Sequence, residues 1–167
     1  MTRIILGVLS GILLSFISVS LFDQWNTLMT AQMFMETNNN FFQATSKLIG
    51  ANFQFDIISF FQIWPNYSVQ EFFQPAFFGC LFIGFISGAI SIGTKRGIMA
   101  SFLVIIITFL MWIILSIFSG VDLMALFQGT QLIATIGGIL SALLSGLLGG
   151  MFGGFLTGKY PTLKKND

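Results

Sequence analysis

The chain has 167 residues, of which 55% are hydrophobic and only 8% are charged, and its mean hydropathy is +0.90. A soluble domain carries about 25% charged residues, so this composition excludes an ordinary water-soluble globule. The net charge of +1 predicts no binding to nucleic acid. One cysteine without any histidine excludes an intrachain disulfide and a Cys/His metal site.

Four segments are apolar, free of charged residues and close to the roughly 20 residues that a membrane span needs. They cover residues 4–22, 76–93, 98–118 and 132–157. Arg3 before the first apolar run also suits a signal peptide, but that run exceeds the roughly 7–15 apolar residues of a signal peptide. We therefore expect an all-α integral membrane protein, with residues 1–167 forming a single membrane domain of four transmembrane helices.

The basic residues predict an orientation in which both termini are cytoplasmic. Basic residues gather in cytoplasmic loops. With the N-terminus inside, the inner segments hold Arg3, Lys95, Arg96, Lys159, Lys164 and Lys165. Only Lys47 is then outside, together with the acidic residues Asp23, Glu36, Asp56, Glu71 and Asp122. The sequence thus predicts a multi-pass protein of the cell membrane, with its N- and C-termini on the inner side.

Residues 23–75 form a long outer segment that is rich in aromatic side chains. One set of residues follows the spacing of a single helix face, and a weaker helical pattern starts at Trp25. Asn38–Asn40 is a plausible break between helices. We expect short amphipathic helices here, lying at the outer membrane interface, where aromatic side chains are favoured. The predicted interfacial or partner surface consists of Trp25, Phe53, Ile57, Phe60, Phe61 and Trp64.

Asn66 begins the sequence Asn66-Tyr67-Ser68, which matches the acceptor pattern for N-linked glycosylation. This three-residue pattern also occurs by chance. Because the predicted topology places it outside, glycosylation of Asn66 would provide an independent check of the orientation.

Two neighbouring rows of small residues run along the fourth predicted span at a spacing of four. One row contains Gly138, Ala142, Gly146, Gly150, Gly154 and Gly158, and the other includes Gly149 and Gly153. Residues four apart share a helix face, and such small-residue strips let helix backbones approach closely in a membrane. Weaker patterns contain Gly7 and Gly11 in the first span, and Gly84 and Gly88 in the second.

Three interpretations of these rows remain open at this point: packing within the chain, an interface with another subunit or a second copy, and the lining of a pore. The third predicted span is bulky throughout residues 102–118. We therefore expect the first, second and fourth helices to pack closely and the third to be more exposed to lipid.

The paired hairpins, the glycine run from Gly146 to Gly158 and the short basic tail resemble small archaeal four-helix membrane proteins of uncharacterised function. The likeness covers mainly the second, third and fourth spans. It implies a four-helix membrane architecture and no particular activity.

The predicted spans contain no Asp, Glu, Lys, Arg or His, residues that usually mark ion paths and proton relays inside membranes. The sequence also has no catalytic or phosphate-binding motif, so we expect neither an enzyme nor a bound cofactor. The leading prediction is a non-catalytic structural or accessory subunit whose partners are the lipid bilayer and other membrane subunits or copies of itself. The alternative is a small homo-oligomeric channel or transporter with a path lined by Ser, Thr and Gly.

Overall fold

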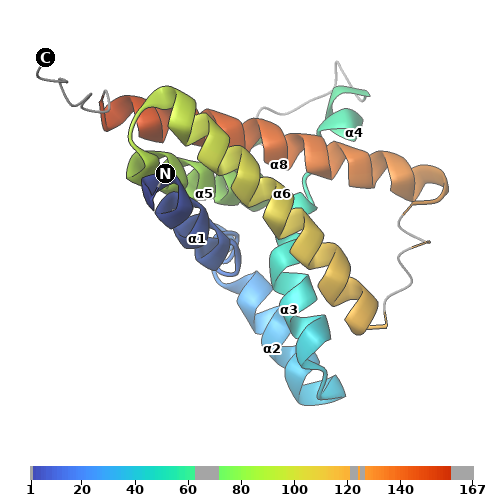
Figure 1. Cartoon of the computed structure of the whole chain (residues 1–167). Helices are drawn as coiled ribbons and strands as arrows, with labels where there is room; N and C mark the ends of the chain where they lie inside the picture. Colours follow the sequence, from blue (N-terminus) through green and yellow to red (C-terminus); the bar gives the residue numbers. More distant parts are fainter. Residues whose placement is uncertain (1, 63–71, 121–123, 125–126, 159–167) are drawn as a thin grey trace, which may run out of the picture.

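A computed structural model describes residues 2–62, 72–120, 124 and 127–158, and all the regular elements in these ranges are helices (Figure 1). Their bounds are α1 Thr2–Ser15, α2 Asn26–Asn38, α3 Phe41–Gly50, the short 3₁₀ helix η1 Ala51–Phe53, α4 Ile57–Gln62, α5 Pro75–Ser91, α6 Thr94–Phe118 and α8 Gly129–Leu156. The all-helical prediction is therefore confirmed for the described part of the chain.

Two helices are long and apolar enough to cross a membrane. They are α6, with a mean hydropathy of 2.9, and the part of α8 from Gln131 to Leu156, with a mean hydropathy of 2.0. Helices α1 and α5 are also apolar but have only 14 and 17 residues. At about 1.5 Å per residue, α5 is about 25 Å long, whereas the hydrocarbon layer of a bilayer is roughly 30 Å thick.

The first apolar run folds differently from the single helix expected over residues 4–22. Helix α1 ends at Ser15, and residues 16–25 continue as hydrogen-bonded turns whose central residues are buried. The Ser15 hydroxyl donates to the Ile12 carbonyl at 2.7 Å. Local side-chain bonds of this kind compete with the hydrogen bonds of a continuing helix. The predicted first span is therefore one short helix followed by a packed, irregular segment.

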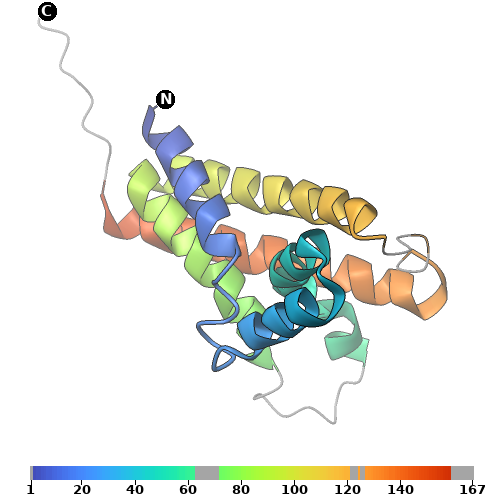
Figure 2. The same ribbon diagram turned by 90° about the horizontal axis from the view of Figure 1, so that it is seen from below.

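Helix α5 contacts α8 most extensively, and it also contacts α1 and α6 (Figure 2). The start of α1, the turn between α5 and α6, and the end of α8 lie at the same end of the molecule (Figure 1). At this end the Gly93 amide donates to the Gly154 carbonyl at 3.2 Å. The turn itself is tighter than expected, because Thr94 already begins α6 and only Ile92 and Gly93, both with positive φ, connect the helices.

The outer segment begins with a hairpin of α2 and α3. The predicted break at residues 38–40 is present: Asn39 adopts a left-handed conformation with φ 47°, and the Asn40 side chain accepts a hydrogen bond from the Gln43 amide at 3.1 Å. An asparagine that accepts in this way is a favoured N-cap, which explains why α3 starts at Phe41.

Helix α3 then packs antiparallel along the second half of α6. The Phe42 and Phe118 rings lie 5.5 Å apart at one end of this contact, and the Ser46 and Ser116 hydroxyl oxygens are 2.8 Å apart near its middle. Beyond α3, the Phe53 side chain of η1 packs against α6 in the main hydrophobic core. The outer segment is thus an integral part of the bundle.

Candidate functional site

The two glycine rows of α8 are covered by other helices of the same chain. The buried members are Gly137, Gly138, Ser141, Ala142, Ser145, Gly146, Gly149, Gly150, Gly153 and Gly154. Against α5, a Cβ atom added to Gly84 would lie 2.8 Å from the carbonyl carbon of Gly146. Packed carbon atoms approach to about 3.5–4.0 Å. The helices therefore meet backbone to backbone, which only glycine permits at this point.

The second row makes equally close contacts further along α5. Cβ atoms added to Gly149 and Gly153 would lie 2.8 Å from the Phe85 nitrogen and 2.9 Å from the Ala89 nitrogen. A Cβ atom on Gly88 would lie 2.8 Å from the Gly150 Cα. These positions lie on one face of each helix, so α5 and α8 touch along several successive turns.

Helix α6 closes the other side of the same strip. An added Cβ atom on Gly150 would lie 2.7 Å from both the Gly97 carbonyl oxygen and the Ser101 Cβ. A Cβ atom on Gly154 would meet the Gly93 oxygen at 2.7 Å. Sequence reasoning missed these three partners because they precede the bulky stretch of the third predicted span. Their signal is the spacing of four from Gly93 to Gly97 to Ser101.

The remaining predicted glycines divide into two groups. Gly7 and Gly11 of α1 are buried, and added Cβ atoms there would lie 2.6 Å from the Ser87 oxygen and 2.6 Å from a Val104 methyl. Gly158, by contrast, has open space around it and a φ of 82°, so it ends α8 in a left-handed conformation. Its predicted role in helix packing is therefore corrected to a role in helix termination.

At the outer end of the rows, α8 contacts η1 and α4. An added Cβ atom on Gly138 would lie 2.9 Å from the Phe53 carbonyl carbon, and one on Gly137 would lie 2.6 Å from the Asp56 carboxyl carbon. Phe53 and Ile57 are consequently buried, at 6% and 9% exposure. The prediction that these two residues belong to an outer interfacial or partner surface is therefore wrong, because both lie inside the bundle.

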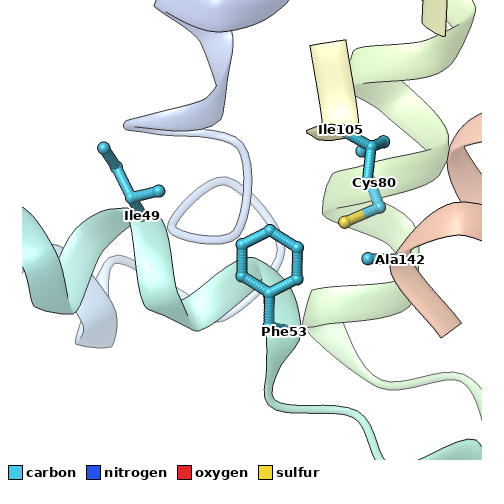
Figure 3. Packing of buried hydrophobic residues seen from close by; sticks show 5 residues of the cluster. All are labelled: Ile49, Phe53, Cys80, Ile105 and Ala142. Carbon is cyan, nitrogen blue, oxygen red and sulfur yellow. The ribbon is translucent and has the colours of Figure 1, made fainter. Parts of the chain in front are cut away.

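A cluster of five buried side chains joins α3 and η1 to α5, α6 and α8. It consists of Ile49, Phe53, Cys80, Ile105 and Ala142, and Figure 3 shows the Phe53 ring between Ile49 on one side and Cys80, Ile105 and Ala142 on the other. Helix α3 lies alongside α6, and η1, which follows it, reaches α8 (Figure 1).

Asn52 forms the polar centre beside this cluster and is 2% exposed. Its amide nitrogen donates to the Ser15 carbonyl at 2.9 Å and to the Ile49 carbonyl at 3.0 Å. Its side-chain oxygen accepts from the Ser18 hydroxyl at 2.9 Å, and the Cys80 thiol donates to its backbone carbonyl at 3.3 Å. Asn52 therefore ties the end of α1 and the following turns to η1 and α5.

Comparisons with known proteins were made by family model, by sequence and by structure. None of the three found a match. The resemblance to archaeal four-helix proteins thus stays a prediction.

The other predicted surface residues lie nearer to the outside. Trp25 is 47% exposed and Phe61 is 60% exposed, whereas Phe60 is half-buried and packs on the Phe55 and Phe72 rings. Phe55 and Ile57 are in turn part of a second buried cluster. Trp64 and Asn66 lie outside the described residues.

The exposed faces of the long apolar helices α6 and α8 are bulky and aliphatic or aromatic. On α8 the exposed row is Ile136, Leu140, Leu144, Leu148, Phe152 and Leu156. A smaller share of α6 than of α8 is buried, 28% against 39%, as expected for the third predicted span. Helix α1 is more exposed than expected, because only Gly7, Gly11 and Ser15 are buried. On α8, small residues thus face inward, and the row of large apolar residues faces outward.

Proposed function

We propose that α1, α5, α6 and α8 are four membrane spans of a multi-pass protein of the cell membrane. The outward rows of large apolar side chains support this, because water disfavours such continuous surfaces and lipid does not. Three of the four described basic residues, Arg3, Lys95 and Arg96, belong to segments at one end of the molecule, and Lys47 is the fourth. Basic residues favour the cytoplasmic side, so this end, with both termini, is cytoplasmic in the proposed topology.

Within the membrane, the chain acts as a non-catalytic structural or accessory subunit. The observation that carries this proposal is the division of small and large residues on α8. Its glycine rows are occupied by α5, α6, η1 and α4, whereas its row of large residues is exposed. Such an arrangement makes a rigid body whose apolar outer faces contact lipid or neighbouring membrane subunits. The glycine rows are then used for packing within the chain, and partners bind the bulky faces.

The test is purification from the native membrane in a mild detergent, followed by native mass spectrometry. The proposal expects an assembly heavier than the chain's own 18.4 kDa, with further chains or copies in fixed stoichiometry. Replacement of Leu144 and Leu148 by alanine, on the exposed row of α8, should weaken that assembly if this face carries the contact. A stable monomer of unaltered fold, obtained under every mild condition, would contradict the subunit role.

A channel or transporter is the second candidate, favoured by hydroxyl groups in the interior. Ser87 and Thr108 are buried at 0% and 1% exposure, and their hydroxyl oxygens have no hydrogen-bond partner within the described residues. Several other interior hydroxyls bond to carbonyls of their own helix, as Ser145 does to Ser141 at 2.8 Å. Ion or solute flux into proteoliposomes separates the two candidates: tight vesicles support the structural role, and selective flux supports a conducting one.

A further inference from the structure

A hollow of about 290 Å³ lies where α3, η1, α6 and α8 meet near the outer ends of α6 and α8. Pockets for drug-sized ligands have volumes of about 300–1,000 Å³, so this hollow suits a small head group or one segment of a larger molecule. Its polar and aromatic lining includes Lys47, Gln54, Trp112, Ser116, Gln131 and Thr135.

The charge of the hollow favours an anion. Lys47 is the only basic residue between Arg3 and Lys95, and none of the described lining residues carries a carboxylate. The Lys47 ammonium lies 5.4 Å from the centre of the Phe34 ring and is exposed. The nearby carboxylate of Asp23 lines a separate, smaller hollow that also includes Lys47, and it accepts a hydrogen bond from the Thr27 amide at 2.8 Å.

Uncharged hydrogen-bonding groups line the same hollow. Gln54, which follows η1, and Gln131 of α8 each bring a side-chain amide, and Ser46 of α3 brings a hydroxyl that is paired with the Ser116 hydroxyl. One positive charge beside amide and hydroxyl groups suits a single anionic group, such as a phosphate or a carboxylate. Hydrogen bonds to a charged oxygen are stronger than those between neutral groups.

The wall of the hollow is aromatic. The Trp112 and Phe53 rings both line it, with their centres 5.7 Å apart. Beside it, the partly buried side chains Phe109, Leu115 and Ile139 pack against the cluster to which Phe53 belongs. A ligand with a negative head and an alkyl chain would therefore find a cation and donors together with aromatic and apolar side chains.

We propose that this hollow binds the phosphate head and adjoining chain of an anionic lipid. The inference rests on the proposed membrane location, because the hollow lies at the outer ends of two proposed spans. Phosphatidylglycerol serves as the test lipid. Phosphatidylcholine serves as its counterpart with no net charge.

The experiment uses Trp112 as a reporter within the hollow. In a variant with Trp25→Phe and Trp64→Phe, Trp112 is the only tryptophan left. The protein is placed in phosphatidylcholine bilayers, and brominated phosphatidylglycerol or brominated phosphatidylcholine is added, because bromine quenches tryptophan fluorescence on contact. We expect half-maximal quenching at an about fivefold lower fraction of brominated phosphatidylglycerol, the factor that corresponds to about 1 kcal/mol for one lysine near a membrane surface.

Lys47→Gln should abolish this preference, while Lys95→Gln, a matched change at the opposite end of the molecule, should leave it intact. Circular dichroism and the thermal unfolding midpoint check that both variants fold. Equal quenching by the two lipids, or an unchanged preference in Lys47→Gln, would overturn the lipid site while leaving the membrane location in place. Quenching by neither lipid would instead contradict the membrane location itself.

A further arm separates a lipid from a free anion. Inorganic phosphate at millimolar concentration should leave quenching by brominated phosphatidylglycerol unchanged, since the aromatic wall contributes only when an alkyl chain is present. Displacement of the lipid by phosphate alone, at the same ionic strength as a chloride control, would show a site for a soluble anion and would overturn the proposal of a lipid.

Discussion

The Asn52 side chain connects η1 to the end of α1 and the turn after it, through Ser15 and Ser18, which lie 37 and 34 residues earlier in the sequence. Its depth in the core gives it no access to water, so each of its hydrogen bonds depends on the others being in place. Sequence reasoning did not find this residue, because one asparagine in a polar and aromatic segment looks like any loop residue.

Replacing Asn52 with alanine should destabilise the fold. The change leaves the Ser15 carbonyl and the Ser18 hydroxyl without their buried partner, and each unsatisfied buried group costs about 1–3 kcal/mol. The free energy of unfolding, measured in detergent, should fall accordingly. Asn38→Ala is the control, because the Asn38 side chain is exposed and its amide donates to the Gln43 side-chain oxygen at 3.3 Å. Equal stability of the two variants would show that the Asn52 network contributes nothing.

The contact between α5 and α8 predicts a second residue-scale effect. Gly84→Ala should destabilise the fold by about 1–3 kcal/mol, the usual cost of overpacking a core. The three atoms nearest to the added methyl all belong to the Gly146 backbone, which cannot rotate away as a side chain would. Leu148→Ala, on the exposed face of α8, is the comparison and should cost far less in the same unfolding measurement. A tolerated Gly84→Ala would mean that the two helices are further apart than described.

At the scale of elements, the hydrophobic pattern predicted where helices form, but it did not predict where a helix is interrupted between Phe53 and Ile57. The face drawn through Phe53, Ile57 and Phe60 has helical spacing, yet residues 54–56 are not helical. The reason is Asp56, whose carboxylate accepts from the Ile58 and Ser59 amides and so starts a new helix at Ile57. Periodicity counts apolar positions and does not register a single capping carboxylate, so the two pieces looked like one helix.

The docking of α3 along α6 was also beyond sequence reasoning, since the Ser46 and Ser116 hydroxyls that meet there are 70 residues apart. It predicts a crosslink. The variant carries Cys80→Ala, which removes the native cysteine, together with Ser46→Cys and Ser116→Cys. The two new cysteines should form an intrachain disulfide under mild oxidation. The two serine hydroxyl oxygens are 2.8 Å apart, so the two side chains point toward each other, and a small adjustment brings sulfur atoms at these positions to the S–S distance of about 2.0 Å. Mass spectrometry of the peptides detects the bond.

The matched control pairs Ser46→Cys with Thr108→Cys. Thr108 lies two turns further along α6, about 12 Å from position 116 at about 1.5 Å per residue, and it is buried as well. This pair should remain reduced within the same oxidation time. Crosslinking of both pairs at the same rate would mean that α3 does not hold a fixed register on α6.

At the scale of the whole molecule, the sequence predicted the apolar helices and the small-residue rows because both follow from local spacing. The surface that packs against the glycine rows is set by contacts between segments far apart in the sequence. For that reason the sequence left open whether the rows pack within the chain, form an interface or line a pore. The structure places α5, α6, η1 and α4 on them. The convergence of the basic segments at one end is likewise a property of the assembled bundle, although the charge count anticipated it.

The proposed topology leads to a labelling prediction for intact cells. In the Cys80→Ala background, single cysteines replace Thr2 and Lys95 at the predicted inner end, or Glu36 and Asn38 in the outer hairpin. All four native side chains are exposed. A membrane-impermeant maleimide should label positions 36 and 38 in intact cells, and positions 2 and 95 only after lysis, because the bilayer separates the two groups.

The four positions also distinguish the ways in which the topology can fail. The reverse pattern, with positions 2 and 95 labelled in intact cells, would invert the orientation and contradict the argument from basic residues. Labelling of all four in intact cells would mean that no bilayer separates the two ends. Opposite behaviour of positions 2 and 95 would place α1 and the turn between α5 and α6 on different sides. Since α1 and α5 contact each other at Gly7 and Ser87, that last result would also contradict the helix packing described above.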